Sequence, residues 1–233
     1  MNPAETVALG AAWYVVFLLA TTCHEAAHAW AAKLGGDPTA FHAGQVSLSP
    51  LPHIRREPFG TVIVPLLSYA IGGWMVGWAS APYDAAWAER HPRRAAWMAL
   101  AGPAANFALL LIAAVLIRAG LWLDYFAAPE VARFTQVVAA TGPGVGQGLA
   151  VVLSILFVLN LLLFLFNLIP LPPLDGHTAI TLLMSEATAR RFRHLTHSFG
   201  MLGLLVAWFL FGRVFGPVYV LALNLLHPGA AYH

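Results

Sequence analysis

The chain has 233 residues, of which 60% are hydrophobic and only 9% are charged. Soluble domains carry about 25% charged residues, so this composition excludes an ordinary soluble protein and predicts an integral membrane protein. The formal net charge is only +2, and the basic residues flank apolar segments, so nothing favours a nucleic-acid partner. The polar intervals are no longer than loops. We therefore expect one membrane-embedded domain over residues 1–233, with its core over about residues 7–183.

The first apolar segment covers about residues 7–33 and contains His24-Glu25-Ala26-Ala27-His28, an H-E-x-x-H motif. Residues four apart lie on one face of a helix, so His24 and His28 can both offer an imidazole nitrogen to one cation. Glu25 would then lie beside the metal, where it could take a proton from bound water. Ionisable groups at membrane depth cost about 2.5 kcal/mol or more each, so their presence here favours a functional role.

The second apolar segment, about residues 59–79, is interrupted by Pro65 and by Gly72-Gly73. The placement of the basic residues predicts how this segment runs. Nine of the twelve Lys and Arg residues lie in three regions, which follow the first span, precede the second and follow the third: Lys33, Arg55, Arg56, Arg90, Arg93, Arg94, Arg190, Arg191 and Arg193. If these regions are all cytoplasmic, as the positive-inside bias favours, the segment must return to the side it left. We therefore predict a re-entrant or broken element.

Three further apolar segments follow. The second span is expected at about residues 95–117, and the third, at about residues 146–169, leads into a proline-rich stretch that contains Asp175. The final stretch, about residues 198–227, is interrupted by Gly212-Arg213 and Pro217, so one long tilted span and a tight helical hairpin both stay open. The predicted fold is an all-α integral membrane protein. It is a multi-span helical bundle with a three-helix catalytic core and a re-entrant or broken element between the first two core helices.

Two carboxylates stand apart from the other acidic residues. Of the ten Asp and Glu residues, only Glu25 and Asp175 belong to apolar membrane segments. Both lie toward the cytoplasmic ends of spans that run inward, so they can meet at a similar depth. His24, His28 and Asp175 would together provide three protein ligands and leave a fourth position for water. This arrangement distinguishes catalytic zinc from closed structural zinc.

Three motifs, in this order, resemble the core motifs of the site-2 protease family of intramembrane zinc metalloproteases: His24-Glu25-Ala26-Ala27-His28, Gly102-Pro103-Ala104-Ala105-Asn106, and Asn167-Leu168-Ile169-Pro170 through Leu174-Asp175-Gly176. Residues 36–60 resemble the compact bacterial and archaeal branch, which lacks PDZ and CBS domains. The resemblance implies that His24, His28 and Asp175 bind one zinc ion per chain. It also implies that Glu25 is the general base and later the proton donor, and that Asn106 holds the substrate backbone or the oxyanion.

Other polar residues allow more than one interpretation. Asn106 either contacts the substrate or hydrogen-bonds between helices. His177 stands where the family often has glycine, and it either orients the neighbouring aspartate or contacts the substrate. His53 is either a loop residue at the membrane edge or a contact to metal or substrate. Asn160 is expected to satisfy backbone groups freed near the following proline.

The predicted function is intramembrane proteolysis by a zinc metalloprotease that cleaves in or near transmembrane segments of membrane proteins. The substrate helix would have to unwind locally, and residues 59–79 could supply a strand edge or a gate for it. We expect a multi-pass protein of a prokaryotic plasma membrane, with its active site toward the cytoplasmic side and its oligomeric state undetermined. The alternative is a membrane metal transporter or sensor that uses the same ligands without hydrolysis.

Overall fold

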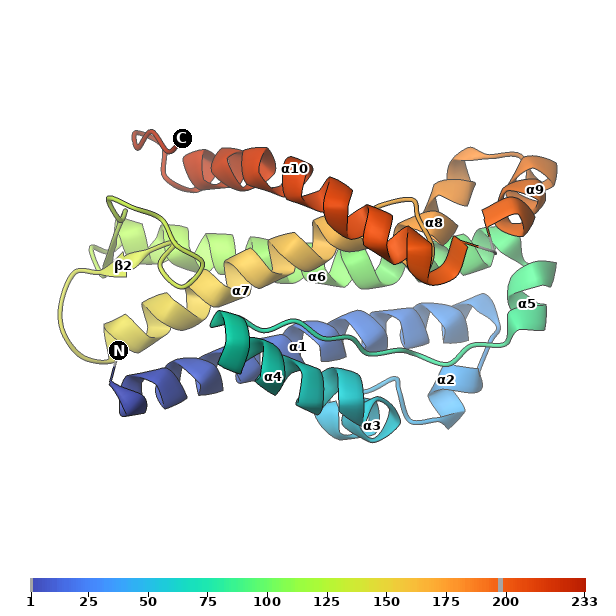
Figure 1. Cartoon of the computed structure of the whole chain (residues 1–233), viewed down its shortest axis with the longest axis horizontal. Coiled ribbons are helices and arrows are strands. Elements are labelled where there is room, and N and C mark those ends of the chain that lie inside the picture. Colours follow the sequence, from blue (N-terminus) through green and yellow to red (C-terminus); the bar gives the residue numbers. More distant parts are fainter. Residues whose placement is uncertain (1, 197–198) are drawn as a thin grey trace.

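The computed structural model describes residues 2–196 and 199–233. In that part of the chain four helices are long and apolar enough to cross a membrane: α1 (Pro3–Gly35), α6 (Pro92–Trp122), α7 (Val145–Asn167) and α10 (Gly200–Leu226) (Figure 1). Two short strands, β1 (Phe126–Ala127) and β2 (Ala139–Ala140), pair antiparallel at one end of the bundle. The predicted all-α membrane bundle is confirmed.

Sequence signals define both ends of α1. The Asn2 Oδ1 accepts a hydrogen bond from the backbone N–H of Glu5 (2.8 Å), and the Glu5 carboxylate accepts one from the backbone N–H of Asn2 (3.1 Å). This reciprocal capping satisfies N–H groups that the first turn leaves free. At the other end Gly36 adopts a left-handed φ of 97°, which favours glycine. The helix is about 50 Å long at 1.5 Å per residue, so it exceeds the hydrocarbon thickness of about 30 Å.

The core lies where α1, α6 and α7 pack against one another. Its largest fully buried apolar side chains come from all three helices and include Trp13, Phe17, Ile117, Ile155 and Val158. Ala20 of α1 and Ala113 of α6 are also fully buried. Helices in lipid associate mainly through close van der Waals packing, which such small residues permit. The predicted three-helix core is therefore present.

The final apolar stretch is one continuous helix, α10, which runs through Pro217. Of the two possibilities that the sequence leaves open, the structure shows the single helix. Beyond its end, the buried His227 places its Nε2 2.8 Å from the carbonyl oxygen of Val137. This contact fastens the end of α10 to the loop that precedes β2.

Short elements fill the interval between α1 and α6: α2 (Thr39–His42), α3 (Pro50–Arg56), the π-helical turn η1 (Phe59–Ile63), α4 (Val64–Gly72) and α5 (Ala85–Arg90). Gly73, with a φ of 73°, ends α4 in a left-handed conformation. From there the chain runs back beside α1 as an extended segment (Figure 1). Gly77 in this segment approaches Phe17 of α1 so closely that a Cβ would overlap the phenyl ring.

Hydrogen bonds tie the returning chain to the end of α1. The Trp87 Nε1 and the Arg94 Nη1 both donate to the carbonyl oxygen of Gly35, at 3.2 and 3.1 Å. The backbone N–H of Asp84 donates to the Asp37 carboxylate at 2.8 Å. The segment therefore returns to the end of the bundle that it left, and the predicted re-entrant or broken element is confirmed.

The Asp37 carboxylate organises this turn. Besides the Asp84 N–H, it accepts hydrogen bonds from the backbone N–H and the hydroxyl of Thr39. Burial opposes ionisation of Asp37, but these three hydrogen bonds hold the pKa of its carboxyl below the ordinary value. The ionised carboxylate thereby joins the end of α1 to the start of α5.

After α7 the chain turns sharply into three short helices: α8 (Asp175–Ala179), the 3₁₀ turn η2 (Ile180–Leu183) and α9 (Glu186–Thr196). The peptide bond between Pro172 and Pro173 in the connecting turn is cis. α8 packs against α6. This packing brings the start of α8, and with it Asp175, next to the central turns of the bundle.

Candidate metal centre

The imidazoles of His24 and His28 face each other on one side of α1. Their Nε2 atoms are 2.9 Å apart, and His24 and His28 are only 7% and 8% exposed. The Oδ2 of Asp175, from the start of α8, lies 3.1 Å from the Nε2 of His24 and 3.3 Å from that of His28. Among the described residues these are the side chains whose ligand atoms form a cluster suited to a metal ion.

Hydrogen bonds on the outer side of each imidazole decide which nitrogen carries the proton. The Nδ1 of His24 lies 2.6 Å from the Oδ1 of Asn106, and the Nδ1 of His28 lies 2.7 Å from the carbonyl oxygen of Met98. Both partners are acceptors, so each Nδ1 carries a hydrogen and donates. Each Nε2 therefore presents a lone pair to the centre.

The third atom at the centre, the Oδ2 of Asp175, also has a lone pair that no donor in the described part of the chain occupies. This oxygen is buried. Three electron-rich atoms thus converge in a space from which water is largely excluded. A buried polar group without a partner is costly, and a cation would satisfy all three atoms at once. The donor set of two imidazoles and one carboxylate fits zinc.

Gly102 of α6 forms one wall of the centre. A Cβ at this position would overlap the Nε2 atoms of both His24 and His28. The backbone of α6 therefore lies directly against the converging nitrogens, and only glycine allows this approach. The motif that begins at Gly102 was recognised in the sequence, but no role was predicted for this glycine. The signal in the sequence that could have indicated a close helix approach was a glycine next to Pro103 within an apolar span.

Gly176 performs a similar role for the third ligand. A Cβ on Gly176 would overlap backbone atoms of Leu168 and Ile169, just beyond the end of α7. Because backbone atoms cannot move aside as a flexible side chain can, α8 begins in this place only if residue 176 is glycine. The close packing fixes the adjacent Asp175 at the depth of the two histidines.

Glu25 is buried, with 6% of its surface exposed, and lies about 100° around α1 from His24. Among the described residues its carboxylate has no hydrogen-bond partner. No neighbouring group therefore competes for its lone pairs. The structure brings His24, His28 and Asp175 together. Glu25 lies next to His24 on α1, and its carboxylate makes no hydrogen bond within the described part of the chain.

Asn106 is fully buried, and its hydrogen bonds all go to the protein. Its Oδ1 accepts a hydrogen bond from the Nδ1 of His24. Its Nδ2 donates to the Oδ1 of Asn160 (2.9 Å) and to the carbonyl oxygen of Ala20 (3.3 Å). Of the two roles that the sequence leaves open for Asn106, the structure shows the hydrogen bonds between helices, one of which goes to a candidate ligand. Asn160 bonds to Asn106 and to the backbone carbonyl of Leu156, one turn earlier on α7, not to backbone groups near the proline.

Comparison with known proteins now places the chain. The family described as "Peptidase family M50" matches residues 12–210. The chain belongs to peptidase family M50. The predicted resemblance to site-2 proteases is confirmed, and the protein is a zinc metalloprotease with several membrane-spanning helices.

Two bacterial proteins resemble this peptidase over most of its length. It is 32% identical over 193 residues to "Putative zinc metalloprotease YwhC" of Bacillus subtilis (strain 168), which covers 82% of this chain and 77% of that protein. It is 29% identical over 177 residues to "Putative zinc metalloprotease Rip2" of Mycolicibacterium smegmatis, which covers 75% of this chain and 58% of that protein. No solved structure matches the peptidase.

Two other histidines singled out in the sequence lie outside the ligand cluster of the peptidase. The Nε2 of His177 is 2.5 Å from the hydroxyl of Thr196, and its ring packs on Phe192 with centroids 5.0 Å apart. These contacts join α8 to α9. Burial, followed by the charge of Arg193, lowers the pKa of His177.

His53 is buried in α3, and its Nε2 donates to the carbonyl oxygen of Ser47 at 3.1 Å. The Gln45 amide donates to the carbonyl oxygen of Pro52 at 3.1 Å, so two side chains brace the loop that precedes α3. The structure does not bring His53 to the metal-ligand cluster. Its hydrogen bond supports the bent loop of residues 46–48.

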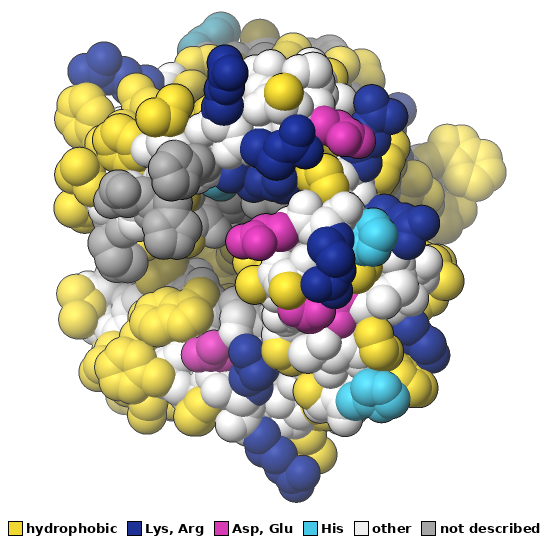
Figure 2. Space-filling model, turned by 90° about the vertical axis from the view of Figure 1, so that its right-hand side faces the viewer, with side chains coloured by type: hydrophobic (Ala, Val, Ile, Leu, Met, Phe, Trp, Pro, Cys, Tyr) yellow, Lys and Arg dark blue, Asp and Glu magenta, His cyan; other side chains and the backbone are white. Residues whose placement is uncertain are grey.

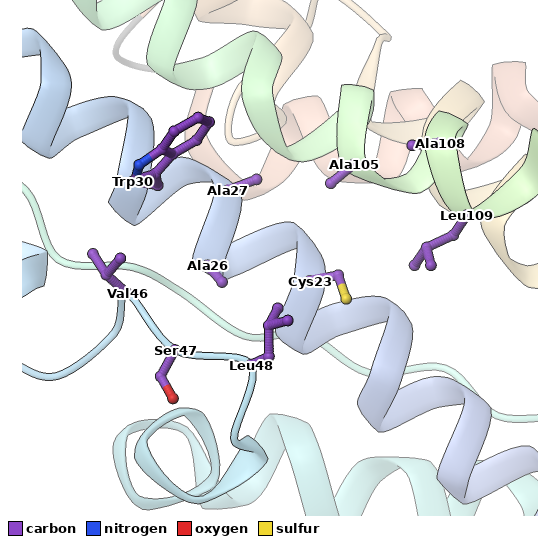
Figure 3. A pocket seen from close by; sticks show the side chains of 10 residues that line it. All are labelled: Cys23, Ala26, Ala27, Trp30, Val46, Ser47, Leu48, Ala105, Ala108 and Leu109. Carbon is purple, nitrogen blue, oxygen red and sulfur yellow. The ribbon is translucent and has the colours of Figure 1, made fainter. Parts of the chain in front are cut away.

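That stretch forms one wall of an apolar groove of about 420 Å³ between α1 and α6 (Figure 3). Ten residues line it: Cys23, Ala26, Ala27, Trp30, Val46, Ser47, Leu48, Ala105, Ala108 and Leu109. Glu25 is two residues beyond Cys23 and therefore points about 200° around the helix from it. The groove and the Glu25 carboxylate therefore lie on different faces of α1.

Proposed function

We propose that this M50 peptidase cleaves peptide bonds in or near the transmembrane segments of membrane proteins. In this proposal one zinc ion per chain is held by His24, His28 and Asp175. The observation that carries it is the convergence of three buried atoms, each with a lone pair and without a proton donor. Two of them belong to α1, a helix apolar enough to span the bilayer. If these residues had only a structural role, their lone pairs would face one another with no cation or hydrogen-bond donor between them.

Glu25 is proposed to move the protons. A zinc ion bound by the three ligands would activate water and polarise the scissile carbonyl. The Glu25 carboxylate accepts the proton that water loses as its oxygen bonds to the carbonyl carbon. It then delivers that proton to the nitrogen of the leaving amine as the C–N bond breaks. One water is consumed and the carboxylate is regenerated.

The depth of the site defines the substrate class. His28 and His24 lie seven and eleven residues before the end of α1, which corresponds to roughly 10–16 Å along the helix axis. A peptide bond that reaches them must enter from within or near the bilayer. Because the carbonyls of a membrane-spanning helix are hydrogen-bonded within that helix, the substrate must unwind locally before it can be cleaved.

The extended segment after α4 is proposed to receive the unwound substrate. The backbone N–H of Val76 donates to the Ser68 hydroxyl (3.0 Å), and that of Trp78 donates to the carbonyl oxygen of Gly60 (3.1 Å). The N–H groups of Gly77 and Ala79, between and beyond them, have no partner in the described part of the chain. This alternation is typical of an edge strand with one side satisfied and one side available for pairing.

The end of the bundle near the site is proposed to face the cytoplasm. Figure 2 looks onto this end and shows Lys and Arg side chains spread over it. The end of α1, α5, the start of α6 and α9 carry seven Lys and Arg residues: Lys33, Arg90, Arg93, Arg94, Arg190, Arg191 and Arg193. Such a bias favours a cytoplasmic location in a prokaryotic cell membrane. Water would then reach the metal from that side.

Glu25→Gln tests the proposal. The variant keeps every metal ligand, so it should retain the zinc content of the wild-type protein and lose cleavage of a model transmembrane substrate in proteoliposomes by about 10²–10⁴-fold. His28→Ala should lose both zinc and cleavage. Glu89→Gln, which changes an exposed glutamate on α5, serves as the matched control. Undiminished cleavage by Glu25→Gln would remove Glu25 from the mechanism. Zinc flux without proteolysis would instead support a transporter.

A further inference from the structure

His24 is not oriented by its immediate neighbour alone. Two asparagines, from α6 and α7, connect its imidazole to the backbone of α7, and both are fully buried. The Asn160 Nδ2 donates to the carbonyl oxygen of Leu156 at 2.8 Å, the Asn106 Nδ2 donates to the Asn160 Oδ1 at 2.9 Å, and the His24 Nδ1 lies 2.6 Å from the Asn106 Oδ1. All three core helices contribute to this chain of hydrogen bonds.

Backbone carbonyls at two points set the direction of the bonds in this chain: that of Leu156 accepts from Asn160, and that of Ala20 accepts from the Asn106 Nδ2 at 3.3 Å, a longer bond than the 2.9 Å bond to Asn160. A backbone carbonyl such as that of Leu156 can only accept, so the Asn160 amide must turn its Nδ2 toward it and its Oδ1 toward Asn106. Asn106 must then turn its own Nδ2 toward Asn160 and its Oδ1 toward His24. The His24 Nδ1 therefore carries the hydrogen, and the lone pair is on Nε2. A flipped Asn106 amide would place two oxygens against each other.

We infer that Asn160 is a positioning residue that fixes the metal-binding tautomer of His24 through Asn106. The inference rests on the proposed zinc site. His28 needs no such relay, because its Nδ1 donates directly to the backbone carbonyl of Met98. Hydrogen bonds behind a metal ligand typically change metal affinity by 10–100-fold. The asparagine chain is therefore expected to matter for zinc retention although Asn160 lies two side chains away from the metal.

The chain contains a matched control on the same helix. The Asn167 Nδ2 donates to the carbonyl oxygen of Leu163 at 3.1 Å, four residues earlier, as the Asn160 Nδ2 does to Leu156. Asn167 has no interhelical partner in the described part of the chain. Replacement of either asparagine by leucine removes the same local hydrogen bond, but only Asn160→Leu breaks the relay.

The first measurement is zinc affinity of the full-length protein in detergent, from competition with a chelator. Asn160→Leu should bind zinc at least 10-fold more weakly than wild type, and Asn167→Leu should stay within about twofold. If leucine is not tolerated at this position, Asn160→Ala gives the same comparison. Equal zinc affinities for Asn160→Leu and Asn167→Leu would overturn the inference.

The second measurement is the ¹⁵N NMR spectrum of His24 in zinc-free protein, which reports directly on the position of the ring hydrogen. Wild type and Asn167→Leu should show the hydrogen on Nδ1, whereas Asn160→Leu should show a mixture of the two tautomers. An unchanged tautomer in Asn160→Leu would overturn the inference even if zinc affinity fell. A wild-type protein without zinc affinity would overturn the proposed metal site alone, because the spectrum still tests the relay.

Discussion

Replacement of Gly102 by alanine should damage the metal centre without removing any ligand. The new Cβ would lie 2.5 Å from the Nε2 of His24 and closer still to that of His28, whereas ordinary van der Waals contact begins at 3.4 Å. The imidazoles or the backbone of α6 must therefore shift by about 1 Å. Displacements of that size at a reacting centre cost about 10²-fold in rate, and overpacking costs about 1–3 kcal/mol of stability.

Three assays check this expectation: zinc retained after dialysis against a chelator, cleavage of a reconstituted transmembrane substrate, and thermal unfolding. We expect at least 10-fold weaker zinc retention and about 10²-fold slower cleavage. Gly212→Ala is the matched control, because it also places a methyl group on a helical glycine but has no atom within 4 Å. Wild-type zinc retention in Gly102→Ala would refute the close approach of α6 to the two histidines.

Four further outcomes are expected. Gly176→Ala should reduce zinc content in elemental analysis, because its methyl group would displace the start of α8. Asp37→Asn should destabilise the protein by about 1–2 kcal/mol at neutral pH; since the pKa of Asp37 is lowered on folding, unfolding midpoints of variant and wild type should converge as pH falls below about 4. In a Cys23→Ala background, a cysteine at Asp84 should react with an impermeant maleimide only from the cytoplasmic side, and one at Asp124 only from outside. Chelation of zinc should lower the midpoint of thermal unfolding of the wild-type protein in detergent.

The sequence predicted the features of the site that depend on local periodicity and on charge. A spacing of four residues put His24 and His28 on one face of a helix, and the rarity of carboxylates in apolar segments drew attention to Asp175. The distribution of Lys and Arg also predicted the return of the segment between α1 and α6. Each of these inferences used a rule that holds before any tertiary contact is known.

The features that the sequence could not predict are contacts between helices. The sequence left Asn106 either a contact with the substrate or a hydrogen bond between helices. The structure shows its amide bonded to His24 and Asn160, and no periodicity links positions 24, 106 and 160. The roles of Gly102 and Gly176 follow from what a Cβ would overlap, which depends on how α6 and α8 approach their neighbours. His53 illustrates the same limit, because a buried histidine that supports a loop has no local signature.

The charges at the centre explain how such a site can exist at membrane depth. His24 and His28 are neutral when they act as ligands, so Asp175 supplies one negative charge and Glu25, in the base role proposed for it, a second. A divalent cation cancels them, and Lys and Arg residues are concentrated instead at the ends of the helices and in the loops. Uncompensated charge is costly within a bilayer. The proposed zinc ion would therefore be the source of reactivity. Its positive charge would also offset the free-energy cost of burying two carboxylates in this bundle.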